Sequence, residues 1–217
     1  FFIWRPKLKI KPTFSEFKQM AQEGNLIPVY QEFLADTETP VSAYLKLKDD
    51  SYSYLLESAD GGKRWGRYSF IGCMPYLRAA SRDSYMEIYE GQKKKVLNEV
   101  GNPLDVLRNL STKFKPATVN DLPPFQGGLV GFFNYDLVRK WEQLPNILPA
   151  DGMHPEAVFI ACRLLIIFDH FTHMIKVVAF AHLSKDADLK TTYDRACREV
   201  AQTTAKLKNP LPLVSKN

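Results

Sequence analysis

One stretch of the sequence gathers residue types that could hold an amino acid. It reads LLESADGGKRWGRYSFIG, residues 55–72, and its apolar start ends in Glu57 and Ser58. A glycine-rich connection leads to three cations, Lys63, Arg64 and Arg67. A carboxylate can bind an ammonium group, and a hydroxyl with a basic side chain can bind a carboxylate, so the stretch could hold an amino-acid zwitterion. A cluster of surface ion pairs around a loop is the alternative interpretation.

The alternation of a β-strand limits which of these side chains can share a ligand. In a regular strand Leu55 and Glu57 point to one face, whereas Leu56 and Ser58 point to the other. Glu57 and Ser58 can therefore contact one ligand only if the strand bends or ends there, or if Glu57 contributes through its backbone. Of the two side chains, we expect Ser58 to make the contact.

Other patterns of catalysis or metal binding are missing from the sequence. His170 and His173 lie three residues apart in a predicted turn, without an HExxH motif or a cysteine pair, so we interpret them as turn residues. The GGLVG run, residues 127–131, lacks the spacing of a phosphate-binding loop and is followed by strand residues. Its glycines are expected to let backbones pack closely. No nucleophile elbow is found. We therefore expect no catalytic residue, metal site or cofactor in this chain.

Composition and charge exclude several classes of protein. The chain has 217 residues, of which 45% are hydrophobic and 24% charged, as in ordinary globular proteins. No apolar run approaches the roughly 20 residues that cross a bilayer, so no membrane partner is expected. The net charge is +5, but the one tight basic run, Lys93 to Lys95, looks like the solvated side of a β-hairpin. Because the other cations are mixed with acids, no nucleic-acid partner is expected.

Cysteine usage indicates the cellular compartment. Cys73, Cys162 and Cys197 are odd in number and widely spaced, which fits neither a disulfide framework nor a zinc site. Reduced thiols in a cytoplasmic protein fit best.

Periodicity predicts the elements that would hold the first stretch in place. A helix is expected over 14–23, where Thr13 and Glu16 form a capping box and Gly24 supplies a left-handed stop. Further helices are expected from Pro40, from Pro103 and over 187–207. Strands are expected over 52–57, 68–71, 76–80, 85–89, near Val96, and over 129–133, 157–168 and 174–181. This order predicts one α+β domain with a mainly antiparallel sheet and flanking helices.

Three long blocks carry a resemblance to a known family. They are IPVYQEFLADTETPVSAYLKL at 27–47, the stretch at 55–72, and PPFQGGLVGFFNYDLVR at 123–139. In this order they resemble the N-terminal region of anthranilate synthase component I, the large subunit, over residues 13–205. The resemblance implies the N-terminal half of the fold of chorismate-utilising enzymes. It further implies an N-terminal extension at 1–12, a regulatory domain at 13–208, and a tail at 209–217 leading toward a missing catalytic domain.

The resemblance also implies an activity for the complete enzyme. That enzyme is a lyase that converts chorismate to anthranilate and pyruvate, the first committed step of tryptophan biosynthesis. It uses Mg²⁺ and ammonia, which a glutamine amidotransferase subunit supplies. The family's chorismate and magnesium residues lie in the second half of the subunit, so no catalytic residue is carried over. This chain alone is expected to be inactive.

What the resemblance implies for this chain is regulation. The LLES motif of the family forms part of the site at which L-tryptophan inhibits the enzyme. Ser58 matches the serine of that motif, and Leu56 and Glu57 match its neighbours. Arg67 lies about where some members place a basic residue near the pocket. Apolar surface that the second half normally covers would favour a homo-oligomer of the isolated chain.

Two other functions remain open at this point. The large subunit of aminodeoxychorismate synthase, an enzyme of folate synthesis, is related to the same family. A stand-alone amino-acid-binding module is the alternative of another class. The match around LLES and GRYSFIG favours the anthranilate branch, and the reading frame beyond Asn217 would separate the module from an enzyme.

Overall fold

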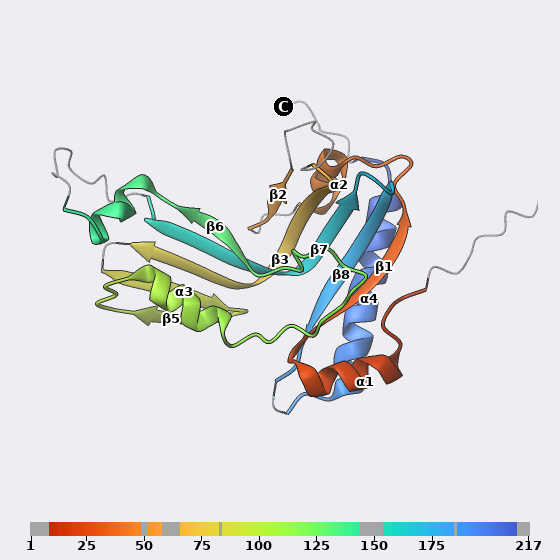
Figure 1. The fold of residues 1–217 in the computed structure, drawn as a ribbon, viewed down its shortest axis with the longest axis horizontal. Helices are drawn as coiled ribbons and strands as arrows, with labels where there is room; N and C mark the ends of the chain where they lie inside the picture. The colour runs from red at the N-terminus through yellow and green to blue at the C-terminus, as the bar shows by residue number, and fades with distance from the viewer. Residues whose placement is uncertain are drawn as a thin grey trace, which may run out of the picture. The chain divides into compact units, whose positions relative to one another are not determined.

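The computed structural model describes residues 9–48, 52–57, 66–82, 84–143, 154–184 and 186–211. The chain folds as two units, and Figure 1 shows their elements. The first unit comprises residues 1–74, 115–126 and 163–217, and the second comprises residues 75–114 and 127–162. Two long strands, β3 (Tyr68–Arg82) and β7 (Ala157–Asp169), have residues in both units.

The first unit is a sheet with helices packed against it. Its strands are β1 (Leu26–Leu34), β2 (Tyr54–Leu56), β8 (Met174–His182) and the adjoining parts of β3 and β7. β1 pairs antiparallel with β8, β8 with β7, and β2 with β3. The helices are α1 (Phe14–Glu23), α2 (Pro40–Leu47) and α4 (Leu189–Lys208). Fully buried side chains such as Phe17, Ile166 and Val200 join helices and sheet in one core.

The second unit has its own smaller core. β4 (Tyr85–Glu90) pairs antiparallel with β3 and with β5 (Lys93–Leu97), and β6 (Leu129–Phe133) pairs antiparallel with β7. The helix α3 (Pro103–Ser111) packs on this hairpin, and a 3-10 helix, η1 (Tyr135–Lys140), follows β6. Leu77, Met86 and Leu107 lie at the centre of the core. The predicted α+β class, with a mainly antiparallel sheet and flanking helices, is confirmed.

The first helix begins as predicted but ends differently. The Thr13 hydroxyl accepts from the Glu16 amide, and the Glu16 carboxylate accepts from the Thr13 amide, so the capping box is present. The prediction of a left-handed stop at Gly24 was wrong, because Gly24 has an extended backbone with φ −152°. A Cβ at this position would meet the carbonyl of Lys115, to which the next two amides donate. The glycine therefore permits a close approach of two backbone segments.

Two strands differ from the sequence prediction. β1 was not predicted, because its first six residues are buried in succession and Pro28 interrupts any alternation. The predicted strands 68–71 and 76–80 are parts of the single strand β3. The strand continues through Pro75 after one left-handed residue, Met74, with φ 56°. The segment η1 was also missed.

Two short turns connect adjacent antiparallel strands, one between β4 and β5 and the other between β7 and β8. Gly91 has φ 59° in the two-residue turn between β4 and β5, as the hairpin requires. His170 and His173 lie in the turn between β7 and β8, which confirms their predicted position. Among the described residues, no helix is long and apolar enough to cross a membrane.

Candidate functional site

The strand pairing shows where the predicted amino-acid site begins. β2 pairs with β3 in the register Leu55 opposite Ile71 and Leu56 opposite Phe70. Leu55 packs against the core of the first unit, whereas the side chain of Leu56 is 41% exposed. Glu57 follows directly and is exposed. Leu55 therefore anchors β2 in the core, while the side chains of Leu56 and Glu57 at its described end are exposed.

Several residues of the predicted site lie outside the described part of the chain. Ser58, Lys63 and Arg64 belong to this group. Leu56, Glu57 and Arg67 are the described members, and they lie on the two sides of the segment that carries Ser58.

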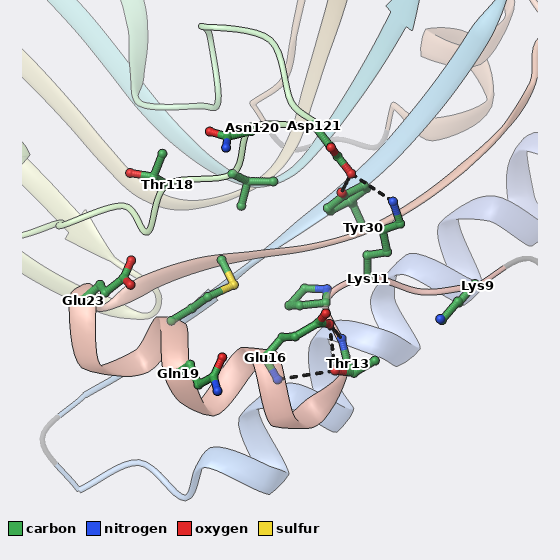
Figure 2. A pocket seen from close by; sticks show the side chains of 13 residues that line it. Lys9, Lys11, Thr13, Glu16, Gln19, Glu23, Tyr30, Thr118, Asn120 and Asp121 are labelled. Carbon is green, nitrogen blue, oxygen red and sulfur yellow. Dashed lines mark hydrogen bonds and ion pairs between the residues drawn. The ribbon is translucent and has the colours of Figure 1, made fainter.

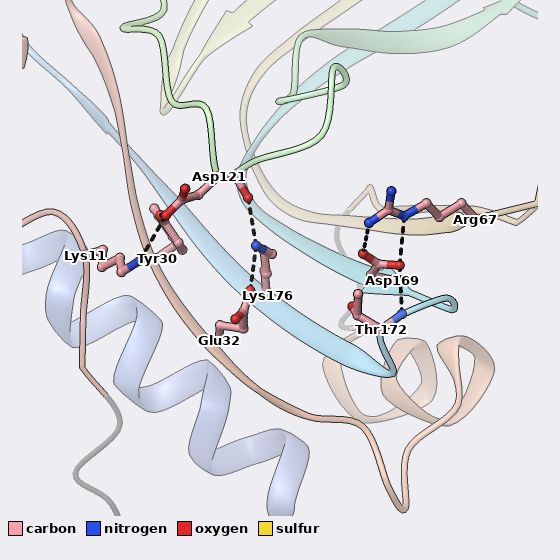
Figure 3. A network of polar contacts seen from close by, with 8 residues as sticks. All are labelled: Lys11, Tyr30, Glu32, Arg67, Asp121, Asp169, Thr172 and Lys176. Atoms are coloured by element: carbon pink, nitrogen blue, oxygen red, sulfur yellow. Dashed lines mark hydrogen bonds and ion pairs between the residues drawn. The ribbon is translucent and has the colours of Figure 1, made fainter.

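Arg67 is engaged in an ion pair with a buried carboxylate. Its Nε donates to Asp169 Oδ1 at 3.1 Å and its Nη2 donates to Asp169 Oδ2 at 2.7 Å, which is a bidentate pair (Figure 3). The guanidinium also lies 4.8 Å from the ring centre of Tyr68 and 5.6 Å from that of Phe171. Fork-shaped pairs of this kind fix geometry as well as charge. Arg67 is thus held at the start of β3 by the turn after β7.

Asp169 is the centre of this arrangement. Its Oδ1 also accepts from the amides of Phe171 at 3.0 Å and Thr172 at 3.2 Å. Burial disfavours the charged form, but the hydrogen bonds from Arg67 and from the turn outweigh it and lower the pKa of Asp169 to about 2. The carboxylate is therefore ionised at neutral pH and joins β3 to the β7–β8 turn.

A second contact strengthens the same junction. Ser69 is fully buried, and its Oγ lies 2.8 Å from Nε2 of His170. The His170 amide donates to the carbonyl of Arg67 at 2.8 Å. A buried serine cannot reach a substrate, so this Ser–His pair is a structural contact. We call the Arg67–Asp169 pair and the Ser69–His170 contact together the β3 clamp. The β3 clamp fixes the chain at Arg67 and Ser69, which follow the predicted site in the sequence.

A second polar region lies beside α1. A hollow of about 470 Å³ lies between α1, β1 and the segment 118–121. Figure 2 shows the side chains that line it. Lys11 Nζ lies 2.9 Å from Asp121 Oδ2, and the Tyr30 hydroxyl donates to the same oxygen at 3.0 Å. These partners lower the pKa of Asp121, while burial and the Asp121 carboxylate raise that of Tyr30.

Several charged side chains in and next to this hollow have partners within the protein. Lys176 donates to the carbonyl of Asp121 at 2.7 Å and pairs with Glu32 at 2.5 Å (Figure 3). Glu16 is used in the capping box. These contacts tie segment 115–126 onto β1 and β8, so we assign the region a structural role. Within the described residues no group of three or more His, Cys, Asp or Glu side chains could hold a metal ion.

Comparison with known proteins identifies the relatives of this chain. No family model matches it. Anthranilate synthase component 1 of Synechocystis sp. is 40% identical over 208 residues, which are 94% of this chain and 40% of the relative. The protein of the same name from Aquifex aeolicus is 38% identical over 93% of this chain and 40% of the relative. This chain is similar to part of anthranilate synthase component 1 over nearly its whole length. The predicted resemblance is thereby confirmed.

The extent of the match matters for what it implies. This chain spans about two fifths of the length of the curated relatives that it matches. A crystal structure of anthranilate synthase component I from Streptococcus pneumoniae matches with a TM-score of 0.55 at 23% identity. That match covers 83% of this chain and 37% of the other, and it supports the fold.

Sequence reasoning singled out the stretch 55–72 by its residue types, but it missed the contacts that hold the chain at Arg67 and Ser69. Asp169 and His170 were assigned only to a turn, and Ser69 was not singled out. One signal was present, because Asp169 is an acid placed directly after a long apolar run. Its partner lies 102 residues away, and no local pattern identifies it.

Proposed function

We propose that this chain is the N-terminal, regulatory part of the large subunit of an anthranilate synthase. The observation that carries the proposal is 40% identity to anthranilate synthase component 1 over 94% of the chain. The intact enzyme would convert chorismate and ammonia to anthranilate and pyruvate. It would use Mg²⁺, and a glutamine amidotransferase subunit would supply the ammonia. The catalytic residues would belong to the part of the relatives that this chain does not match.

We further propose that the end of β2 forms one side of an L-tryptophan site. Ser58 would bind the amino-acid carboxylate through its hydroxyl, and Leu56 and Glu57 would border the ligand. The exposure of Leu56 and Glu57 supports this arrangement. The engagement of Arg67 with Asp169 supports a positioning role for Arg67 in place of a direct contact with tryptophan. The β3 clamp would then fix the chain at Arg67, where the described residues resume after Ser58.

Inhibition requires two states of the enzyme. Tryptophan would favour the state with poorer chorismate turnover because it binds that state more tightly. Binding with equal affinity to both states would leave the equilibrium between them unchanged. A site formed partly by this chain and partly by the remainder of the subunit would give such a difference, because relative movement of the two parts would change the pocket.

The replacement Ser58→Ala in the intact enzyme tests the site. We expect the tryptophan concentration for half-inhibition to rise by roughly tenfold or more, because a hydrogen bond to a charged group contributes about 1.5–3 kcal/mol. Turnover without tryptophan should stay within about twofold of the wild type, since Ser58 is not assigned to catalysis. The measurement is the rate of anthranilate formation at increasing tryptophan concentration.

Ser53→Ala is the matched control. Ser53 also precedes β3 in the sequence, but its hydroxyl donates to the Tyr44 hydroxyl at 3.2 Å, and Ser53 has the strand parity of Leu55. Its replacement should leave inhibition unchanged. Unaltered inhibition in Ser58→Ala would reject the site, and an equal loss in both variants would indicate a general structural effect.

A further inference from the structure

The strand β5 places lysines where apolar side chains are expected. In the register of the hairpin, Lys95 lies opposite Ile88 and Leu97 lies opposite Met86. Ile88 and Met86 are buried beneath α3 in the core of the second unit. Because alternate residues of a strand share a face, Lys93 and Lys95 lie on the side of the hairpin on which α3 packs, and both side chains are exposed at the edge of the helix. Val96, on the other face, is 46% exposed. At these positions of β5, lysines lie on the side of α3 and an apolar residue lies on the other side, which is the reverse of the usual alternation.

A hollow of about 490 Å³ lies between this face and α3. Ile88, Leu97, Val106 and Leu110 supply its apolar lining. Lys93, Lys95 and Lys113 supply ammonium groups around it. Figure 1 shows α3 lying over β5. Lys113 follows two residues after the end of this helix at Ser111. The volume is in the range of small-molecule sites.

The hollow carries an excess of positive charge. Glu90 is the acid in its lining, and it pairs with Lys113 at 2.8 Å. Lys94 also borders the hollow, but it pairs at 2.6 Å with Glu87 on the opposite face of the hairpin. Among the described residues, Lys93 and Lys95 have no carboxylate within ion-pair distance. Lys93 lies opposite Glu90 in the hairpin register, whereas Lys95 lies opposite the apolar Ile88. Within the described part of the chain, two ammonium groups therefore stand beside an apolar lining without an ion pair.

We propose that this hollow binds a small organic anion that combines an apolar body with a phosphate or carboxylate group. The apolar body would lie against Val106 and Leu110, and the anionic group would accept hydrogen bonds from Lys93 and Lys95. Lysine on an edge strand also prevents pairing with other sheets, and β5 is at the end of the described strand order. Edge protection explains the charges, but it does not require a hollow with an apolar lining beneath them.

Titration calorimetry of the full chain with phenyl phosphate tests the proposal. We expect one saturable site per chain, with affinity that falls as salt is raised. Inorganic phosphate and phenol, which are the two halves of the probe, should each bind at least fivefold more weakly. Benzoate in place of phenyl phosphate distinguishes a site for carboxylates from one for phosphates. Equal binding of phenyl phosphate and inorganic phosphate would overturn the proposal.

Adjacent lysines provide matched variants. Lys95→Gln should weaken binding of phenyl phosphate at least fivefold, whereas Lys94→Gln should change it by less than twofold because the Lys94 ammonium faces Glu87. Both variants remove one charge from the same strand, so a general electrostatic attraction would weaken equally in both and would contradict a specific site. Circular dichroism and the unfolding midpoint show whether each variant is folded. Because the side chains of Lys94 and Lys95 are exposed, the spectrum and the unfolding midpoint of each variant should match those of the wild type. The result is independent of tryptophan regulation, since the hollow lies in the second unit.

Discussion

Replacing Asp169 by asparagine is expected to lower the free energy of unfolding by about 2–3 kcal/mol. The carboxylate is buried and accepts two hydrogen bonds from Arg67 and two from turn amides. Asparagine keeps the size but removes the charge and replaces one acceptor by a donor. The lowered pKa gives a similar value, because a fall from 3.8 to about 2 corresponds to about 2.5 kcal/mol. Chemical denaturation of both proteins at pH 7 measures the difference.

The same pair predicts a dependence on pH. Because the folded-state pKa of Asp169 is lowered, its stabilisation is complete above the unfolded-state value near 3.8 and is lost as the pH falls toward 2. The gap between wild type and Asp169→Asn should therefore narrow between pH 5 and pH 2. A gap that stays constant over this range would show that the charge of Asp169 is not responsible.

Asp194→Asn is the control for this effect. Asp194 pairs with Lys190 one helical turn away at 2.6 Å, and its side chain is 39% exposed. An exposed pair of this kind contributes about 0.5 kcal/mol or less. Equal destabilisation by the two replacements would contradict the special role of the β3 clamp.

Replacing Gly131 by alanine is expected to destabilise the protein by about 2–3 kcal/mol. Gly131 pairs with Phe159, and a Cβ at Gly131 would overlap the carbonyl oxygen of Val158 and the Cα of Phe159. Both atoms belong to the backbone of β7, so no side-chain rotation can relieve the overlap. β6 would have to move away from β7. The midpoint of thermal unfolding should fall by roughly 5–10 °C for a protein of this size.

Gly101→Ala is the matched replacement at an unconstrained position. No atom lies within 4 Å of a Cβ built on Gly101. Its free energy of unfolding should change by less than about 0.5 kcal/mol. A comparable loss in both variants would mean that the close approach of β6 and β7 is not what requires glycine at 131.

Local signals allowed much of the fold to be predicted. The capping box of α1 lies within four residues, and the turn at Gly91 needs only one left-handed position. Elements that depend on distant partners were harder. β1 has no alternation because buried residues follow each other along it, and Gly24 is extended because its neighbours pair with Lys115. Neither feature can be derived from the adjacent sequence.

The candidate site also combines residues with a local sequence signal and contacts that depend on distant partners. Residue types alone identified the stretch around Glu57, and the resemblance added its interpretation. The engagement of Arg67 by Asp169 depends on a contact between residues 102 positions apart, so sequence reasoning assigned Arg67 to the ligand. The lysines of β5 were recognised as part of a hairpin, but the register of the pairing was needed to show which of them face α3.

The most direct measurement is the effect of L-tryptophan on anthranilate formation by the proposed intact enzyme, of which this chain would be the N-terminal part. The assay would supply chorismate, Mg²⁺ and ammonia, and would follow anthranilate by its fluorescence. We predict anthranilate formation that tryptophan inhibits in a saturable manner. Anthranilate formation that millimolar tryptophan leaves unchanged would contradict the regulatory role, and no formation of anthranilate at all would contradict the proposed enzyme.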